Sequence, residues 1–173
     1  MKLNINPPDF IYCPFCGNKL EIKFDGEKER KYCLTDNWTY YPFVANAVGA
    51  VIRNGDKVLL VKRNKEPYKN TWMFPAGFVD YGEHPEDSLA REVKEETGLD
   101  VISSSLMGIF QVDDDPRSPG HFDFFYEVKV GLKNEIKTDK DENNDINWFD
   151  LINLPEIGWH THQKVVDIVR KEV

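Results

Sequence analysis

The sequence predicts an α/β fold in which a globular domain follows a small β module that carries cysteines. Two observations support this division. Strand-like apolar runs and helical stretches succeed one another from about residue 40 onward. All three cysteines lie within residues 11–38, together with a charged turn around Gly26. We therefore expect a module at residues 1–39 and a main domain at residues 40–173.

The bulk composition excludes several classes of protein. Hydrophobic residues make up 40% and charged residues 30% of the 173 residues, as in soluble globular proteins. The net charge of −8 leaves no visible basic face for nucleic acid, although phosphates can still bind through a metal ion. The longest apolar stretch, residues 44–52, is far below the ~20 residues of a membrane helix. With no secretory signal at the N-terminus, we expect a cytoplasmic protein.

The main domain should begin with a β-hairpin. Residues 45–53 and 57–63 are apolar, β-branched runs, and Asn54-Gly55 between them suits a tight turn with positive φ. Residues 65–77 are expected to form a loop.

A helix should follow at residues 85–97, because proline suits the first helical turn and Gly98 suits the position after the last. Further strands are expected at residues 106–112, 121–130 and 146–149, with a proline-containing loop after the first and a polar loop before the last. The strand at 121–130 alternates and should be half-buried. Helical spacing then predicts an amphipathic C-terminal helix that includes Val165, Ile168, Val169 and Glu172.

Three glutamates on the predicted helix carry the main chemical signal. Glu92, Glu95 and Glu96 are three or four residues apart, so they share one helix face. The apolar side opposite is formed by Leu89, Ala90 and Val93. We expect the helix to pack its apolar face into the core and to concentrate negative charge on the other.

A solvated acidic helix is the plain alternative, and three details argue against it. Arg91 lies beside the cluster, where it can orient Glu83 or a glutamate through a forked hydrogen bond. A tight turn at residues 75–77 lets the backbone approach the glutamates. Convergent carboxylate oxygens are also what Mg²⁺ ligation requires.

Residues 77–99 resemble the Nudix box, which is a glycine, five residues, a glutamate, seven residues, and then Arg-Glu-apolar-x-Glu-Glu-x-Gly-apolar. The matching residues are Gly77, Glu83, Arg91, Glu92, Val93, Glu95, Glu96, Gly98 and Leu99. The resemblance extends from about Tyr40 to the end of the chain. It implies an α/β/α sandwich with a mixed sheet, in which the box forms a loop, a helix and a loop.

The resemblance also implies roles for individual residues. Glu92, Glu95 and Glu96 would bind Mg²⁺ or Mn²⁺, joined by the backbone carbonyl of Ala76. Glu83 and Arg91 would fix the loop to the helix. The family often adds a carboxylate from a late loop, for which Glu142 is the first candidate. Its competitors are Glu135, Asp139, Asp141 and Asp145, and simple solvation of Glu142 is as good an explanation.

The expected reaction is hydrolysis of a pyrophosphate bond. Metal ions would neutralise the phosphate oxygens and lower the pKa of a bound water for in-line attack. Glu95 or Glu92 would assist removal of the water's proton.

The first module carries half of a zinc site in Cys13-Pro14-Phe15-Cys16-Gly17. The second pair keeps the spacing but ends in aspartate, as Cys33-Leu34-Thr35-Asp36. This resembles the small zinc ribbon that precedes some Nudix domains, with one ligand changed. We expect structural zinc bound by Cys13, Cys16, Cys33 and Asp36, the alternative being a degenerate ribbon without metal. Its role would be structural or dimerising, so a homodimer is considered.

Histidines and aromatic residues give weaker signals. His84, His121, His160 and His162 are scattered and are better explained as surface or packing residues than as ligands. The aromatic residues at the start of the domain could stack on a base, but core packing is the more frequent role. They are Tyr40, Tyr41, Phe43 and Trp72.

The substrate is the least determined part of the hypothesis. A ribbon followed by a Nudix box is similar to NADH pyrophosphatases, but the run rich in Gln, Pro, Trp and Phe that follows their box is absent. Residues 115–121, Asp-Pro-Arg and then Pro-Gly-His, resemble the loop of short ADP-ribose pyrophosphatases. We therefore expect ADP-ribose or another ADP-sugar, with NADH and nucleoside triphosphates as alternatives. A non-catalytic nucleotide sensor is disfavoured because the box is intact.

Overall fold

The protein is described from a computed structural model, which covers residues 9–131, 136–137 and 142–171. The chain divides into two compact units, Met1–Phe43 and Val44–Val173. Tyr40, at which we expected the main domain to begin, therefore belongs to the first unit. Within the described residues, no helix has the length and apolar character needed to cross a membrane.

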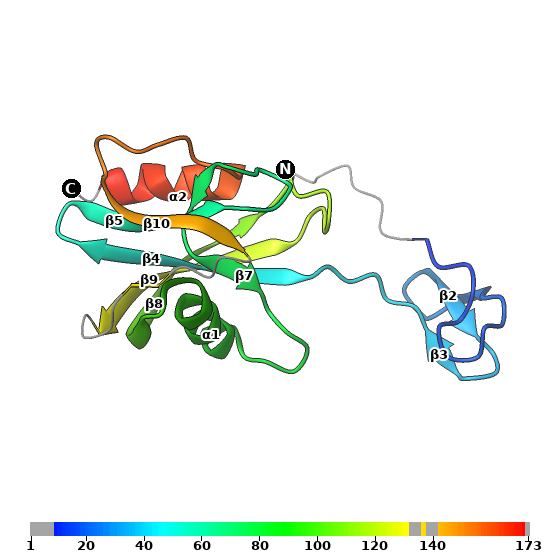
Figure 1. Cartoon of the computed structure of the whole chain (residues 1–173). Coiled ribbons are helices and arrows are strands. Elements are labelled where there is room, and N and C mark those ends of the chain that lie inside the picture. The colour runs from blue at the N-terminus through cyan, green and yellow to red at the C-terminus, as the bar shows by residue number, and fades with distance from the viewer. Residues whose placement is uncertain (1–8, 132–135, 138–141, 172–173) are drawn as a thin grey trace. The chain divides into compact units, whose positions relative to one another are not determined.

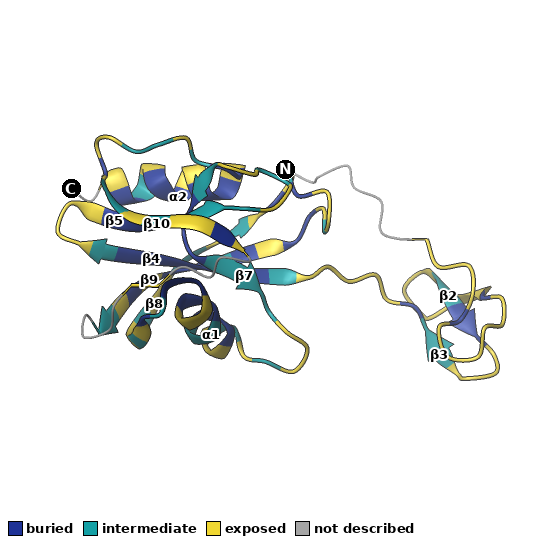
Figure 2. Cartoon of the chain, viewed as in Figure 1, coloured by how far each residue is buried: buried dark blue, intermediate teal, exposed yellow. Residues whose placement is uncertain are grey.

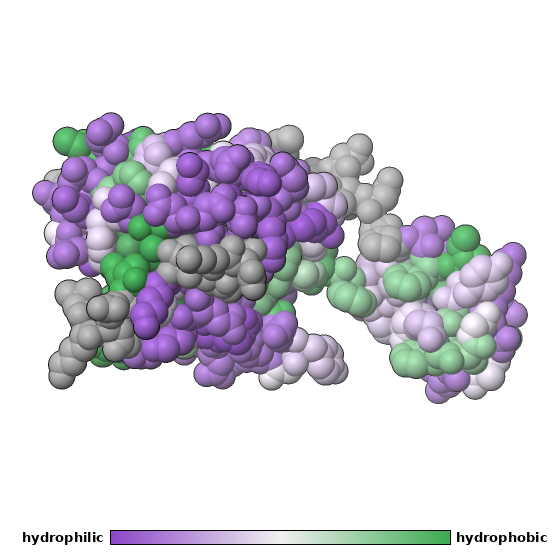
Figure 3. Space-filling view, viewed as in Figure 1, coloured by the Kyte–Doolittle hydropathy of each residue, from purple (hydrophilic) through white to green (hydrophobic). Residues whose placement is uncertain are grey.

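The first unit is a small antiparallel sheet with the order β1-β2-β3. Its strands are β1 (Glu21–Phe24), β2 (Glu29–Cys33) and β3 (Trp38–Thr39). Its core is small, formed by Cys13, Leu20 and Cys33 with Trp38 packed against them. Most residues of this unit are exposed (Figure 2). They include large apolar residues such as Phe15 and Phe24. Figure 3 shows hydrophobic areas on the surface of this unit.

The second unit contains, within the described residues, a mixed sheet of seven strands (Figure 1). Five form the order β10-β5-β4-β9-β8, while β6 pairs with β5 and β7 pairs with β4. The pair β4–β9 is parallel and the other pairs are antiparallel. The strands are β4 (Asn46–Asn54), β5 (Lys57–Arg63), β6 (Trp72–Met73), β7 (Ala76–Phe78), β8 (Asp100–Gln111), β9 (Phe122–Gly131) and β10 (Asn143–Asp150).

Two helices cover opposite faces of this sheet (Figure 1). α1 (Pro85–Thr97) packs Leu89 and Val93 against one face, and α2 (His160–Arg170) packs Val165, Val166 and Val169 against the other. Successive side chains of β4 point to opposite faces of the sheet, so β4 contributes to both cores. Ile52 packs in the core with α1, and Val51 packs in the core with α2. The mixed sheet between two helical layers confirms the predicted α/β/α sandwich.

The hairpin and the first helix agree closely with the sequence. β4 and β5 pair next to the turn, where Gly55 has a φ of 59°. α1 spans the predicted residues and ends at Gly98, whose φ of 74° suits glycine. His84 caps its N-terminus by accepting a hydrogen bond from the backbone N–H of Glu86.

Other elements differ from the expectations. β8 begins six residues earlier than the strand predicted at residues 106–112, and the predicted loop at 65–77 contains β6 and the start of β7. β9 is not simply half-buried, because Asp123 and Phe125 are buried on the face opposite to Tyr126. A central strand between β4 and β8, with a helix on each face, is covered on both sides.

The position of β7 shapes the site. β4 pairs with β5 only through Arg53 and Asn54, and farther along, residues 47–49 of β4 pair with β7 instead. The backbone N–H of Ala50 donates to the carbonyl of Pro75 at 2.8 Å. The segment that precedes α1 is therefore built into the sheet, which fixes it against the helix.

Candidate active site and cysteine cluster

A cavity of about 310 Å³ opens in the second unit, above the ends of several strands and beside both helices. The acidic part of its wall includes Glu92 and Glu96 of α1, Asp80, and Glu142 just before β10. The wall also carries the basic side chains Arg63, Lys65 and Arg117, of which Lys65 forms an ion pair with Glu142. Asp115, His121, Asp123, Trp159 and His162 also line the cavity, with Ala76, Gly77 and Phe78 of β7.

Glu96 is the most constrained carboxylate of the helix. Only 2% of the residue is exposed, and each carboxylate oxygen accepts one hydrogen bond. The donors are the backbone N–H of Ala76 and Nδ2 of Asn143, each at 2.9 Å. Burial raises the pKa of the Glu96 carboxyl to about 8. The residue is thus a buried acid whose orientation is fixed by β7 and β10.

Glu92 lies one turn earlier on the same side of α1 and is also buried. Its carboxylate is packed so closely over Gly77 that a Cβ at that position would stand 2.0 Å from the Glu92 Cδ. Burial raises the pKa of Glu92, while its hydrogen bond from Arg91 acts in the opposite direction. A side chain at Gly77, the first glycine of the box, would therefore displace the Glu92 carboxylate.

The expectation that the glutamates lie on the helix face opposite the apolar one is wrong for two of them. Glu92 and Glu96 belong to the buried side of α1, next to Leu89 and Val93. Glu95 is different: 55% of its side chain is exposed, it accepts from Arg91 Nη1 at 3.3 Å, and it does not line the cavity. The structure brings Glu92, Glu96, Ala76 and Glu142 around one cavity and leaves Glu95 at its outside.

Arg91 joins the loop before α1 to the helix. Its Nε and Nη2 donate to the two carboxylate oxygens of Glu83, at 3.1 and 2.9 Å. Nη2 also donates to the carbonyl of Phe78, and Nη1 donates to Glu92 at 2.7 Å. The Arg91 hydrogen bonds lower the pKa of Glu83 to about 2. Neither Arg91 nor Glu83 lines the cavity, so both act on it through Glu92 and the loop.

The late carboxylates separate into two groups. Glu142 lines the cavity from an exposed position and forms an ion pair with Lys65, whose Nζ lies 3.1 Å from Oε1. Asp145 does not line it, and its carboxylate accepts from the neighbouring N–H of Ile146. Glu135, Asp139 and Asp141 lie outside the described residues.

The basic side of the cavity combines two arginines with aromatic rings. The guanidinium carbons of Arg63 and Arg117 lie 5.7 and 5.4 Å from the centre of the Trp159 ring. Arg117 is also 5.1 Å from the ring of Phe78. Burial and the nearby charge of Arg117 lower the pKa of Arg63. Two adjacent guanidinium groups favour an anion, and the rings offer flat surfaces for a base or sugar.

Two of the four histidines are buried beside the cavity. His121 Nε2 lies 3.1 Å from Asp123 Oδ1, and Thr161 donates to the other carboxylate oxygen of Asp123. Burial opposes protonation of His121, but its contacts with Asp123 and the Ser118 carbonyl leave its pKa raised. His162 accepts from the N–H of Phe74 at 3.1 Å, and burial lowers its pKa to about 4. His84 and His160 are exposed.

The residues present fit a divalent cation on the acidic side of the cavity. Two buried carboxylates lie on one helix side at the cavity, and burial disfavours their negative charge, as the raised pKa values indicate. A cation would reverse this effect by stabilising the charged form. Hard carboxylate oxygens are the ligands of Mg²⁺ and Mn²⁺.

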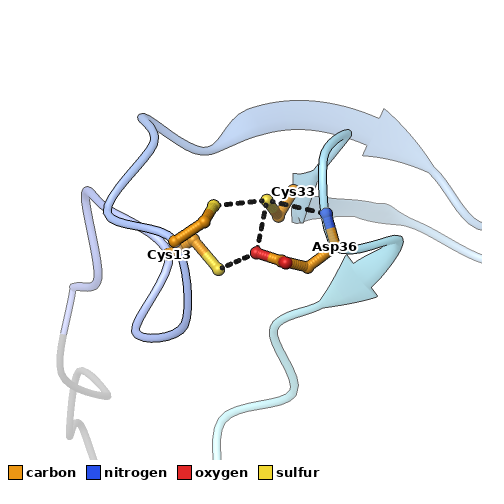
Figure 4. Close-up of side chains that lie close together, drawn as sticks. Cys13, Cys33 and Asp36 are labelled. Carbon is orange, nitrogen blue, oxygen red and sulfur yellow. Dashed lines mark hydrogen bonds between the residues drawn. The ribbon is translucent and has the colours of Figure 1, made fainter.

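The cysteines of the first unit converge with Asp36. One ligand atom from each of Cys13, Cys16, Cys33 and Asp36 lies within 4.8 Å of the others. Figure 4 shows Cys13 and Cys33 directed toward the Asp36 carboxylate, which lies 3.1 and 3.4 Å from their sulfurs. The Cys16 and Cys33 sulfurs are 3.5 Å apart and are free thiols. Four ligands at about 2.0–2.3 Å from one tetrahedral ion would stand at similar separations, so the set fits zinc.

Sequence reasoning missed the basic wall and the supports of Glu96. Arg63 ends a predicted strand, Arg117 lies in a predicted loop and Trp159 precedes the last helix, so their spacing in the sequence gives no sign that they meet. Asn143 lies beside Glu142, but only the pairing of β10 with β5 brings it to the helix. Of the four aromatic residues considered for base stacking, Trp72 packs against Phe149, which agrees with a role in the core.

Comparison with known proteins identifies the second unit. The family model of the NUDIX domain matches residues 44–167. An ADP-ribose pyrophosphatase from Methanocaldococcus jannaschii is 37% identical over 127 residues, which cover 73% of each chain. An NAD-capped RNA hydrolase, NudC, from Vibrio atlanticus is 32% identical over 155 residues. That match covers 85% of this chain but 52% of the NudC protein, so the chain spans about half the length of that relative.

A solved structure supports the fold over nearly the whole chain. A NUDIX hydrolase from Nitrosomonas europaea superposes with a TM-score of 0.74, covering 94% of this chain and 92% of that one. At 22% sequence identity, this similarity concerns the fold alone.

Proposed function

This chain belongs to the Nudix hydrolase family and is a pyrophosphatase, and from that premise we propose that it hydrolyses ADP-ribose or another ADP-sugar. Hydrolysis of ADP-ribose consumes one water and releases AMP and ribose 5-phosphate. The observation that carries the proposal is the cavity, whose wall combines buried carboxylates with Arg63, Arg117 and Trp159. The 37% identical relative named an ADP-ribose pyrophosphatase supports the choice of substrate.

The acidic side would hold Mg²⁺ or Mn²⁺. Glu92 and Glu96 would provide ligands, with the carbonyl of Ala76 and, after a change of side-chain orientation, Glu95 and Glu142. When bound, the metal would neutralise the pyrophosphate and lower the pKa of an attacking water. Glu92, which lines the cavity, is better placed than Glu95 to accept the water's proton.

The basic side would bind the rest of the substrate. Arg63 and Arg117 would pair with phosphate oxygens through their planar guanidinium groups. Trp159 and Phe78 would contact the base or a sugar ring. Asn143 and the Ala76 N–H would keep Glu96 in one orientation, so that ligand geometry is set before substrate arrives.

The cysteine cluster of the first unit would bind structural zinc through Cys13, Cys16, Cys33 and Asp36. One ion would link the Cys13–Cys16 segment to the Cys33–Asp36 segment. This link would stabilise a module whose own apolar core is small.

A second candidate substrate is a dinucleotide such as NADH. The NudC match aligns 155 residues, more than the 130 of Val44–Val173, so it reaches into the cysteine-containing unit as well. An ADP-sugar is favoured over NADH because the match to the ADP-ribose pyrophosphatase covers 73% of this chain and 73% of that relative. Nucleoside triphosphates are the third group to test.

The test is a substrate panel with ADP-ribose, other ADP-sugars, NADH and nucleoside triphosphates, each in Mg²⁺, in Mn²⁺ and in EDTA. We expect kcat/KM to be highest for an ADP-sugar, with AMP and a sugar phosphate as products, and no turnover in EDTA. A Glu96→Gln sample purified in parallel controls for contaminating phosphatases. A higher kcat/KM for NADH would replace the proposed substrate, and binding of ADP-ribose without any hydrolysis would indicate a sensor.

A further inference from the structure

A second group of potential metal ligands lies at the edge of the cavity. Asp113 and Asp114 follow β8, and His160 is the first residue of α2. One ligand atom from each of these residues lies within 4.8 Å of the others. None of the three belongs to the acidic side that would hold the catalytic cation, and none lines the cavity.

The separations within this group match those of ligands on one ion. His160 Nδ1 lies 3.3 Å from Asp113 Oδ1 and 3.7 Å from Asp114 Oδ2. Two ligands that each stand about 2.1 Å from a tetrahedral ion are about 3.4 Å apart. The same separations would also allow a hydrogen bond from a protonated imidazole, so distance alone does not select the cation.

Asp114 supplies an independent reason to expect a ligand. Only 10% of its side chain is exposed. Oδ2 accepts hydrogen bonds from the Tyr68 hydroxyl at 2.8 Å and from the His160 N–H at 2.9 Å. Oδ1 is buried and has no hydrogen-bond partner among the described residues. A buried carboxylate with one unsatisfied oxygen is costly, and a cation bound through both oxygens of this carboxylate would remove that cost.

The surrounding charge also favours a cation. Three consecutive aspartates, Asp113 to Asp115, begin this loop. Asp115 is paired with Arg117, at 2.8 Å. For Asp113 and Asp114, the ion pairs found among the described residues involve His160 alone. Among the described residues, neither carboxylate therefore forms an ion pair with a lysine or an arginine.

We propose that Asp113, Asp114 and His160 bind a first-row divalent transition-metal ion. An imidazole together with carboxylates suits Ni²⁺, Co²⁺ or Zn²⁺ better than Mg²⁺, which prefers oxygen ligands. The ion would join the loop after β8 to the start of α2. Because Asp115 and Trp159 adjoin the ligands and line the cavity, it would hold two parts of the cavity wall together.

The test is a titration of the full chain with Ni²⁺ in excess Mg²⁺, which occupies sites made of oxygen ligands. Paramagnetic loss of the histidine ring signals in NMR spectra reports binding at each imidazole. We expect the His160 signals to disappear at Ni²⁺ concentrations at least tenfold lower than those that affect His84. His84 is exposed and serves as the internal control for nonspecific binding.

A pair of charge-matched variants identifies the ligands. Asp113→Asn should raise the Ni²⁺ midpoint of His160 at least tenfold, because it removes a ligand at an exposed position without affecting Tyr68. Asp167→Asn removes one exposed charge from α2 outside the group and should leave the midpoint unchanged. Equal responses of His84 and His160, or equal midpoints in the two variants, would overturn the proposal and leave only contacts between His160 and the aspartates.

Discussion

At the scale of single residues, Glu96 carries opposing demands. Its carboxylate is almost fully buried and held by two hydrogen bonds, yet a metal ligand must be charged. Without a cation, burial favours the protonated form. The proposed chemistry thus needs the charged form of Glu96, which the fold without a metal disfavours. Such conflicts between stability and function are frequent at functional sites.

The substitution Glu96→Gln separates these two effects. It preserves volume and the hydrogen bond from Ala76 while removing the charge, so we expect kcat to fall more than tenfold, a barrier increase above ~1.4 kcal/mol. The fold should remain intact by circular dichroism. A variant that keeps more than about a tenth of the wild-type kcat would show that Glu96 is not an essential ligand.

The same pair of proteins should differ in the pH dependence of stability. The pKa of Glu96 is raised from 4.5 to about 8 in the folded chain, so the folded state holds a proton that the unfolded state loses between these values. Stability in EDTA should therefore fall as pH rises through that window. In Glu96→Gln this contribution is absent, and its Tm relative to wild type should rise from about pH 5 to pH 8. A constant difference in Tm would contradict the raised pKa.

At the scale of elements, the site depends on how closely β7 approaches α1. Gly77 has no side chain, and the Glu92 carboxylate occupies the place of the missing Cβ. Glu92 cannot easily move, since it is buried and held by Arg91. The loop and the helix are therefore matched in shape at this point.

Gly77→Ala should disturb that match. The added methyl would force Glu92 or the loop to shift, which we expect to destabilise the fold by about 1–3 kcal/mol and to lower kcat at least tenfold. Urea denaturation and steady-state kinetics measure the two effects. Gly131→Ala is the matched control, because its Cβ would meet its nearest neighbour at 3.9 Å, an ordinary contact. Similar losses in both variants would indicate a general cost of replacing glycine in the sheet.

Elements that depend on local signals could be predicted from the sequence. The turn at Gly55 and the helix bounded by Pro85 and Gly98 were found because the residues themselves select the backbone conformation. The short strands β6 and β7 were missed because two or three residues have no periodicity, and they exist only through pairing with β5 and β4. The burial of Glu96 was missed for the same reason, since its partner Asn143 is 47 residues away.

At the scale of the whole molecule, the chain consists of two units with different means of stabilisation. The sheet unit has two apolar cores, one on each face, whereas the core of the first unit contains two of its three cysteines. A module of this size usually requires a metal or disulfides. Loss of one thiolate should therefore affect the two units unequally.

Cys16→Ser tests this difference. We expect purified wild type to contain about one zinc per chain, and the variant to contain less, with increased proteolysis within the first unit. The kcat should change less than twofold, because the carboxylates and arginines of the cavity lie in the second unit. Elemental analysis, limited proteolysis and kinetics provide the measurements. Zinc-free wild type with an intact first unit would support a degenerate ribbon, and a collapse of kcat would tie the ribbon to the site.

The insertion of the 75–78 segment beside β4 has a consequence for motion. The N–H of Ala50 donates a hydrogen bond to the carbonyl of Pro75. β7 pairs with one side of β4, and the parallel strand β9 pairs with the other. Loosening of this segment would break the middle of the sheet, so it should not occur as a local fluctuation. Amide hydrogen exchange at Ala76 and Gly77 should then require the same free energy as global unfolding, whereas amides of the exposed 80–84 turn should exchange far sooner. The segment at residues 75–78, with the Ala76 carbonyl proposed as a ligand of Mg²⁺ or Mn²⁺, would therefore be among the last parts of the protein to unfold.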